Sequence, residues 1–385
     1  MRRVDASVLM MLSLIFGGCD QAGPDVSVAT LADSSGVEII ASPDANVASL
    51  QIDKLPDLTL GGLDATGPEA FGDVAGVVVA RDGSIWVSDE QSLSVEVFEA
   101  DGTHRMSVGR GGDGPGEFRR VVLVGAAGDS VAVHDGPSYQ LNWFGLDGEW
   151  LGSERVEASL RAVTTAGDPV GATSPLFTVP PGSVMRDSAT FELWSSSAEA
   201  WVEIARVPTQ PFLVSEGGSL TPIPFRATAA VDANEYMLVV AGPVFEVRQL
   251  DRGGILQRIL RVSRPPRPVD ANARAERRAF VEAEYDADRR DRYLAALEHE
   301  HVPDLQAAYH DVVAGSDGSS WAHRYDVSFP DAQPWDVFGA DGSYEGAVQL
   351  PDGFELAAVT AEHVYGVHTD ECGVDEVRRY RIIRP

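Results

Sequence analysis

Acidic and imidazole side chains follow several short apolar runs of this chain, at the points where the runs end. A histidine accompanies an acid in two of these places, at His134 with Asp135 and at His368 shortly before Asp370. Carboxylates, imidazoles and guanidiniums that converge from separate elements can bind a cation, a sugar or a peptide. We therefore expect ligand binding by a set of nine residues, which are Asp89, Glu117, Arg119, His134, Asp135, Arg324, His368, Asp370 and Glu371.

The same set also permits a metal-dependent reaction. Calcium takes about six to eight oxygen ligands, so several of these carboxylates could surround one ion, with a nearby histidine as general base. An aspartate at a strand end is equally an ordinary turn residue, and a single histidine there is more often structural. The pattern therefore identifies no catalytic residue and no definite metal ligand, and calcium is the one cofactor it suggests.

The glycine-rich stretch from Gly111 to Phe118 resembles a phosphate-binding loop only superficially. No Lys-Ser or Lys-Thr pair follows it, and no helix is expected to start there. Asp113 and Glu117 would repel a phosphate group. We expect this segment to form a tight crossing between two structural units instead.

Two repeated motifs indicate the elements that position these side chains. The motif F-x-x-D-G occurs at 98–102, 144–148 and 338–342, and the motif G-P-x-x-F occurs at 67–71 and 114–118. The first two copies of F-x-x-D-G are 46 positions apart, and the two copies of G-P-x-x-F are 47 apart. A β-rich period of this length is typical of a propeller blade, and Asp-Gly favours the tight turns of hairpins.

The strand pattern predicts an all-β fold, a six-bladed β-propeller, with seven blades as the alternative count. Four short strands are expected in each of the first five blades, with the third blade the least regular. The sixth blade has only three strands before the chain ends at Pro385. We expect the N-terminal segment 58–61 to supply its fourth strand, because closing the ring removes an exposed edge.

Residues 265–303 interrupt the repeat between blades four and five. This segment is rich in Ala, Glu and Arg, and its apolar residues recur at helical spacing. Asp270 or Asn272 can cap the start, and Pro303 ends the pattern. We expect a helical insertion, which either caps the ring or forms a lid over a ligand site.

The N-terminal sequence has the pattern of an export signal. Residues 1–18 combine a basic start with a short apolar stretch, too short to span a bilayer. Small residues directly before Cys19 resemble a bacterial lipobox, which implies lipidation of Cys19. We expect residues 19–36 to act as a lipidated tether and residues 37–385 to form the propeller. Cys372 is then a lone thiol.

The charge balance excludes some partners. The chain has 59 acidic and 30 basic residues among 385, a formal net charge of −29. Nucleic acid binding needs a basic surface, so nucleic acid is excluded, and adsorption to anionic lipid is disfavoured. We expect contact with a membrane only through the lipid anchor.

Several segments resemble bacterial six-bladed β-propeller lipoproteins of the NHL and TolB-like superfamily. The resemblance covers residues 37–385 and rests on residues 36–40, the stretch ending at Phe118, residues 335–342, and residues 370–380. It implies the propeller fold. It says little about function, because such folds host lactone hydrolases, lyases and binding modules.

We therefore expect a monomeric protein that is lipid-anchored in the bacterial cell envelope, on its periplasmic or outer-membrane face. Its expected role is a binding module for an envelope protein, a glycan or a peptide. Two alternatives stay open: a hydrolase resembling the calcium-dependent lactonases, and a structural subunit of an envelope complex.

Overall fold

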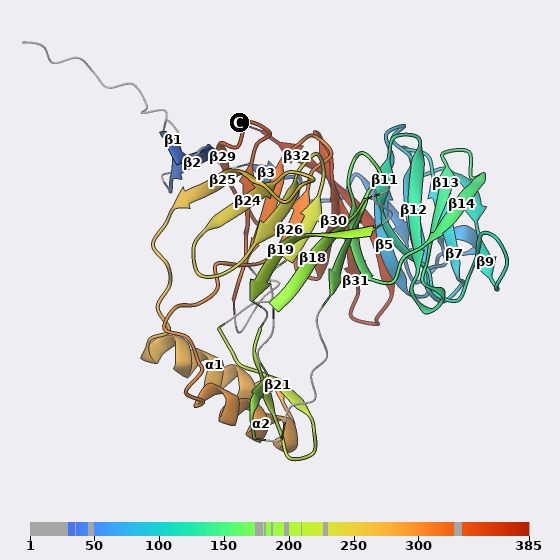
Figure 1. Cartoon of the computed structure of the whole chain (residues 1–385). Helices are drawn as coiled ribbons and strands as arrows, with labels where there is room; N and C mark the ends of the chain where they lie inside the picture. The colour runs from blue at the N-terminus through green and yellow to red at the C-terminus, as the bar shows by residue number, and fades with distance from the viewer. Residues whose placement is uncertain are drawn as a thin grey trace, which may run out of the picture.

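The computed structural model describes residues 30–34, 36–44, 50–173, 180, 182–185, 188–195, 200–208, 210–225, 230–326 and 333–384. The predicted export signal at 1–18 and Cys19 lie outside these ranges. The described chain is mostly β-structure, in a series of antiparallel sheets that follow one another along the sequence (Figure 1).

Four sheets are built from four strands that are consecutive or nearly so in the chain, a six-stranded sheet contains four consecutive strands, and another sheet contains three. In chain order their strands are β5 (Val74–Val79), β6 (Ile85–Asp89), β7 (Ser94–Phe98) and β8 (His104–Val108); β11 (Val122–Ala127), β12 (Ser130–Asp135), β13 (Gln140–Gly145) and β14 (Trp150–Arg155); β15 (Ser159–Val163), β16 (Pro169–Thr173), β18 (Ser188–Ser195) and β19 (Ala200–Pro208); β22 (Ala230–Ala233), β23 (Met237–Val240), β24 (Glu246–Leu250) and β25 (Leu256–Ser263); β26 (Tyr309–Ala314), β27 (Ser320–Arg324), β28 (Trp335–Phe338) and β29 (Tyr344–Val348); and β30 (Phe354–Val359), β31 (His363–Thr369) and β32 (Asp375–Ile383).

The first strands of these sheets contact one another in a cycle. β5 contacts β11, β11 contacts β15, β15 contacts β22, β22 contacts β26, β26 contacts β30, and β30 contacts β5. This is a propeller-like arrangement, in which the first strand of each sheet lies innermost. The hydrophobic clusters lie between successive sheets, so neighbouring sheets share their core.

The N-terminal strands attach to sheets that come much later in the chain. β2 (Val37–Pro43) runs parallel to β25 at the outer edge of its sheet, and β1 (Thr30–Ser34) pairs with β2. β3 (Gln51–Ile52) and β4 (Leu58–Gly61) both pair antiparallel with β32. The segment 58–61 therefore pairs with the last strand, as the sequence predicted. β1 lies inside the segment that the sequence assigned to a tether.

Two helices separate β25 from β26, where the sequence predicted a helical insertion. They are α1 (Ala271–Glu284) and α2 (Ala287–Leu297). The carboxylate of Asp270 caps α1, and Asp286 caps α2, because each accepts a hydrogen bond from a backbone N–H three residues on. The predicted helical insertion therefore consists of two helices, each with its own cap. Neither helix is long and apolar enough to cross a membrane, as far as the described residues go.

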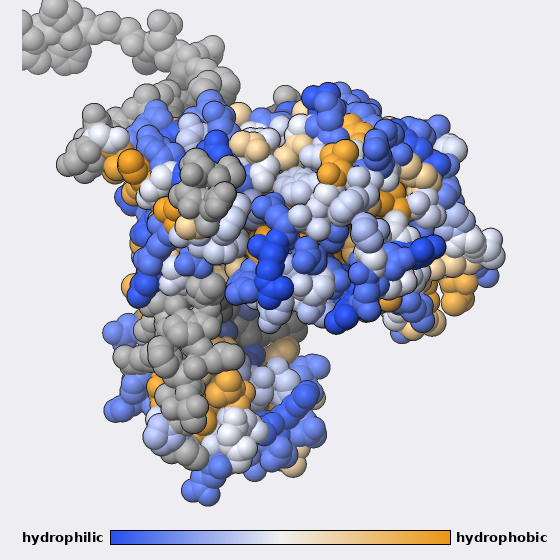
Figure 2. Space-filling view, turned by 45° about the vertical axis from the view of Figure 1, so that its right-hand side comes forward, coloured by the Kyte–Doolittle hydropathy of each residue, from blue (hydrophilic) through white to orange (hydrophobic). Residues whose placement is uncertain are grey.

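The helices do not pack on the inner strands. Leu297 of α2 and Ala273 of α1 are buried against Ile223 and Phe225, which follow a small sheet of β17 (Val184–Met185), β20 (Phe212–Val214) and β21 (Leu220–Pro222). Figure 1 shows α1, α2 and β21 together, apart from the larger sheets. Figure 2 shows the same appendage projecting from the body, on a face that is mostly hydrophilic with scattered apolar groups.

The repeated F-x-x-D-G motif forms the turn between the third and fourth strands of three sheets. Its phenylalanines, Phe98, Phe144 and Phe338, are all buried. Its glycines, Gly102, Gly148 and Gly342, adopt φ between 83° and 88°, which glycine reaches without strain. The motif is therefore structural, as its sequence predicted.

Candidate functional site

Asp89 and Asp135 occupy equivalent places at the ends of β6 and β12. The Asp89 carboxylate accepts hydrogen bonds from the backbone N–H groups of Gly72 (3.2 Å) and Asp73 (2.8 Å). The Asp135 carboxylate accepts the corresponding bonds from Arg119 (3.1 Å) and Arg120 (3.2 Å). In each case the donors directly follow the phenylalanine of G-P-x-x-F. Each aspartate thus anchors the loop that enters its own sheet, and each is almost fully buried.

The other acidic candidates also bond within their own loops. Glu117 accepts from the Gly114 backbone N–H (2.9 Å) and pairs with Arg110 at 2.7 Å. Asp370 accepts from the backbone N–H groups of Cys372 and Val374, at 2.8 and 2.9 Å. Glu371 is exposed on the same turn. These bonds use carboxylate oxygens that the ligand-binding hypothesis had assigned to a ligand.

The basic candidates are divided between surface and interior. Arg119 pairs with Asp113 at 2.5 Å on the surface. Arg324 donates to the fully buried Asp336 at 2.6 Å. His368 shares a hydrogen bond with the backbone carbonyl of Gly353 at 3.1 Å. Burial lowers the pKa of His134, whose Nε2 has no partner among the described residues.

Direct contacts among these candidates are few. Of the nine, Arg119 and Asp135 are joined by a hydrogen bond, and that bond is made by the arginine's backbone. Nor does the described part of the chain hold a group of three or more His, Cys, Asp or Glu side chains placed to bind a metal ion. The role of these nine residues in ligand binding stays a prediction.

A cavity of about 770 Å³ lies at the centre of the cycle of first strands. Its wall contains residues of β5, β11, β15, β22, β26 and β30, with a few from second and third strands. No lining residue comes from α1 or α2, so the insertion does not cover this cavity as a lid. Ligand sites in proteins have typical volumes of about 300–1,000 Å³, and this cavity falls in that range.

The wall of this cavity contains a series of β-bulges. In five sheets the pairing between the first and second strand skips one residue of the first strand. A bulge changes the direction of a side chain and is common next to functional sites. The skipped residues all line the cavity, and they are Ala75, Val124, Arg161, His310 and Ala357.

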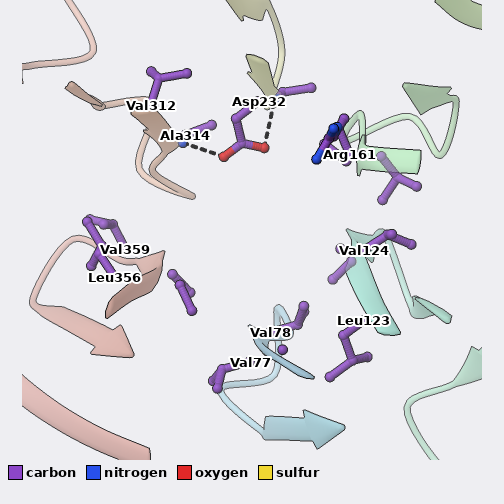
Figure 3. A pocket seen from close by; sticks show the side chains of 18 of the residues that line it. Val77, Val78, Leu123, Val124, Arg161, Asp232, Val312, Ala314, Leu356 and Val359 are labelled. Carbon is purple, nitrogen blue, oxygen red and sulfur yellow. Dashed lines mark hydrogen bonds between the residues drawn. The ribbon is translucent and has the colours of Figure 1, made fainter. Parts of the chain in front are cut away.

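One side of the cavity is apolar, and the other side carries charged residues among further apolar ones. β5 and β11 contribute valine, leucine, alanine and glycine only. The remaining inner strands contribute Arg161, Asp232, Asp311 and Glu355. In Figure 3, Val77, Val78 and Leu123 lie across the cavity from Asp232, and the Arg161 side chain is directed into the opening.

Two half-buried aspartates of the cavity have raised pKa values. Burial raises the pKa of Asp232 to about 7, although it accepts backbone hydrogen bonds from Ala314 (2.7 Å) and Ala233 (2.8 Å). Burial raises the pKa of Asp311 to about 6, and the negative charge of Glu355 acts in the same direction. The positive charge of Arg161 partly opposes this shift at Asp311. The charge of the cavity wall near neutral pH therefore depends on how far these two carboxyl groups are protonated.

Sequence reasoning missed these residues because it searched the loops for ligand groups. A signal was present in the strands themselves: Arg161, Asp232, Asp311 and Glu355 interrupt innermost strands that are otherwise mostly apolar. Charged residues are uncommon in innermost strands that are otherwise apolar, so they call for a special reason. The bulges at Arg161 and His310 were not visible in the sequence pattern.

Comparisons with known proteins yield similarity of fold alone. No protein-family model matches the chain, and no curated protein matches it. Among solved structures, a Bacteroides fragilis protein described as exported is 8% identical, with a TM-score of 0.45 over 90% of this chain and 99% of that one. A DUF4221 family member from Bacteroides vulgatus is 10% identical, with a TM-score of 0.47 over 88% and 100%. Virginiamycin B lyase from Staphylococcus aureus is 11% identical, with a TM-score of 0.40 over 87% and 100%.

Proposed function

We propose that this protein is an exported, lipid-anchored, six-bladed β-propeller that binds a small molecule in its central cavity. The six-bladed count is supported by the cyclic contacts of the six first strands. Closure of the ring is supported by the antiparallel pairing of β4 with β32, which completes the last sheet. Export and lipidation at Cys19 are supported by the sequence of residues 1–19.

The observation that carries the binding proposal is the pair of unpartnered charges in the cavity. Arg161 and Glu355 line it, and neither makes a hydrogen bond or ion pair to another described residue. Both side chains are exposed to the cavity, so their charged groups are solvated and are free to take partners from a molecule that enters it. A bound molecule would provide those partners. The cavity, rather than the loops predicted from sequence, is therefore the proposed site.

A substitution that fills part of the cavity tests this function. Ala75 is a bulged residue that lines the cavity, so Ala75→Phe should occupy part of its volume. The full chain, purified from the envelope, would be analysed by native mass spectrometry for a co-purified molecule and by thermal shift against a metabolite library. We expect at least one compound to bind the wild type, and the Ala75→Phe variant to bind it at least about tenfold more weakly.

The matched control is Ala283→Phe, which places the same side chain on the exposed surface of α1. It should bind the compound as the wild type does. Equal binding by the wild type and the Ala75→Phe variant would refute the central cavity as the site.

The anchor is tested separately: Cys19→Ser should move the protein from the detergent phase to the aqueous phase in a phase-partition assay.

A further inference from the structure

Resting on the proposed function, we propose that the ligand is a small zwitterion with an apolar side group. Its carboxylate would bind Arg161, its ammonium group would bind Asp311 and Glu355, and its apolar group would lie on β5 and β11. A free amino acid with an aliphatic or aromatic side chain, or a short peptide, has this chemistry.

Arg161 provides the site for the anionic group. It is the skipped residue of a bulge in β15, between Leu160 and Ala162, and its side chain is directed into the cavity (Figure 3). No described carboxylate lies within ion-pair distance of its guanidinium. A guanidinium binds a carboxylate through two parallel N–H···O bonds, which are stronger and more directional than bonds between neutral groups.

Asp311 and Glu355 provide the site for the ammonium group. One Asp311 oxygen accepts the Val312 backbone N–H at 2.8 Å, and its second oxygen accepts no hydrogen bond from another described residue. Glu355 has an exposed side chain that lines the cavity and contacts no described basic group. Because the negative charge of Glu355 opposes ionisation of Asp311, a cation placed between the two carboxylates relieves this repulsion. Asp232 is different, since both its oxygens already accept backbone hydrogen bonds.

The positions of the strands separate the two charged sites. In the cycle of first strands, β15 is third and β30 is sixth, so Arg161 and Glu355 lie on opposite walls. β26, which carries Asp311, is next to β30. The apolar strands β5 and β11 fill the arc from β30 to β15 on the other side. A molecule with two opposite charges and one apolar group matches this three-part wall.

Calorimetric titration of the full chain with matched probes tests the ligand class. The zwitterions are L-leucine and L-phenylalanine. L-leucinamide lacks the carboxylate, and 4-methylpentanoate lacks the amine. We expect both analogues to bind at least about tenfold more weakly than L-leucine. Arg161→Gln should remove the preference for L-leucine over L-leucinamide, and Glu355→Gln should remove the preference over 4-methylpentanoate. Arg81→Gln, at an exposed ion pair with Asp129, should keep both preferences.

These preferences distinguish a specific role from a general loss of folding, because each variant should lose one preference and keep the other. Retention of both preferences by Arg161→Gln would overturn the proposal. The proposal would also be overturned if neither zwitterion binds and an uncharged or singly charged compound binds the wild type but not the Ala75→Phe variant. If no compound of any class binds, and Ala75→Phe changes nothing, the central binding function itself is refuted.

Discussion

The Asp336 carboxylate accepts a hydrogen bond from the Arg264 guanidinium at 2.8 Å, across 72 positions of the chain. Asp336 is fully buried, and it also accepts bonds from Arg324 (2.6 Å) and from the hydroxyls of Tyr309 (2.8 Å) and Tyr344 (2.7 Å). Arg264 in turn pairs with Asp44, just after β2, at 2.6 Å. One buried carboxylate therefore connects β28, the end of β25 and the N-terminal strands.

Asp336→Asn should strongly destabilise the protein. The substitution leaves two arginines beside a neutral group, and breaking a buried ion pair typically lowers the free energy of unfolding by about 3–5 kcal/mol. Urea denaturation would measure the change. Asp129→Asn, in an exposed pair with Arg81, should change the stability by less than about 1 kcal/mol. Equal effects of the two substitutions would contradict this account of Asp336.

Asp135→Ala should lower stability without affecting ligand binding in the cavity. It removes the acceptor for two part-buried backbone N–H groups, and an unsatisfied donor costs about 1–3 kcal/mol when fully buried and less when part-buried. Glu371→Ala, at an exposed turn, should change neither property. The measurements are urea denaturation and calorimetric titration. Loss of binding with unchanged stability in the Asp135→Ala variant would restore the ligand-binding hypothesis for the loop residues.

His323→Phe should reduce the sensitivity of folding to acid. Burial, together with the neighbouring His310, lowers the pKa of His323 to about 4. Below a pH of about 6.5, His323 binds a proton in the unfolded chain but not in the folded protein, so wild-type stability falls as the pH drops toward 4. Phenylalanine can keep the stacking on Trp335, whose ring centroid is 4.4 Å away.

Urea denaturation at pH 7.5 and pH 4.5 would compare the His323→Phe variant with the wild type. The variant should lose less stability between the two pH values. A stability loss as large as that of the wild type would show that His323 does not carry this dependence.

Leu60→Asp should disrupt the pairing of β4 with β32. Leu60 is 2% exposed and lies opposite Val377, within a cluster that includes Ile85 and Tyr365. A buried, unpaired carboxylate there should lower the free energy of unfolding by more than about 3 kcal/mol. The matched control is Thr59→Asp, whose side chain is exposed on the opposite face of the same strand. Denaturation would measure stability, and light scattering would detect association through the uncovered edge of β32.

Much of the fold could be predicted because its signals are local. Asp-Gly turns, alternating apolar runs and a repeat of 46 or 47 residues located most strands of the first two sheets within a few residues. The helical insertion was predicted from its spacing, and the structure shows it divided into two helices at Asp286. The pairing of 58–61 with the last strand was predicted from a motif and from the missing fourth strand.

Long-range pairings without a motif could not be predicted. The parallel pairing of β2 with β25 and the small sheet of β17, β20 and β21 depend on contacts between distant segments. In the third sheet, the strand expected at 177–179 lies outside the described residues, while β16 at 169–173 was not anticipated. The candidate site was missed for a related reason, because a bulge at Arg161 becomes visible only when two strands are paired.

The pairing of β4 with β32 also constrains the order in which the molecule can assemble. Asp57, beside β4, and its partner Arg379, in β32, are separated by 322 positions. When the chain emerges N-terminus first from a ribosome or a translocation channel, β4 has no partner strand until nearly all other residues have emerged. The early sheets can form in sequence, but the circle is completed last, so its final step should be slow and should leave the edge of β4 open in the meantime.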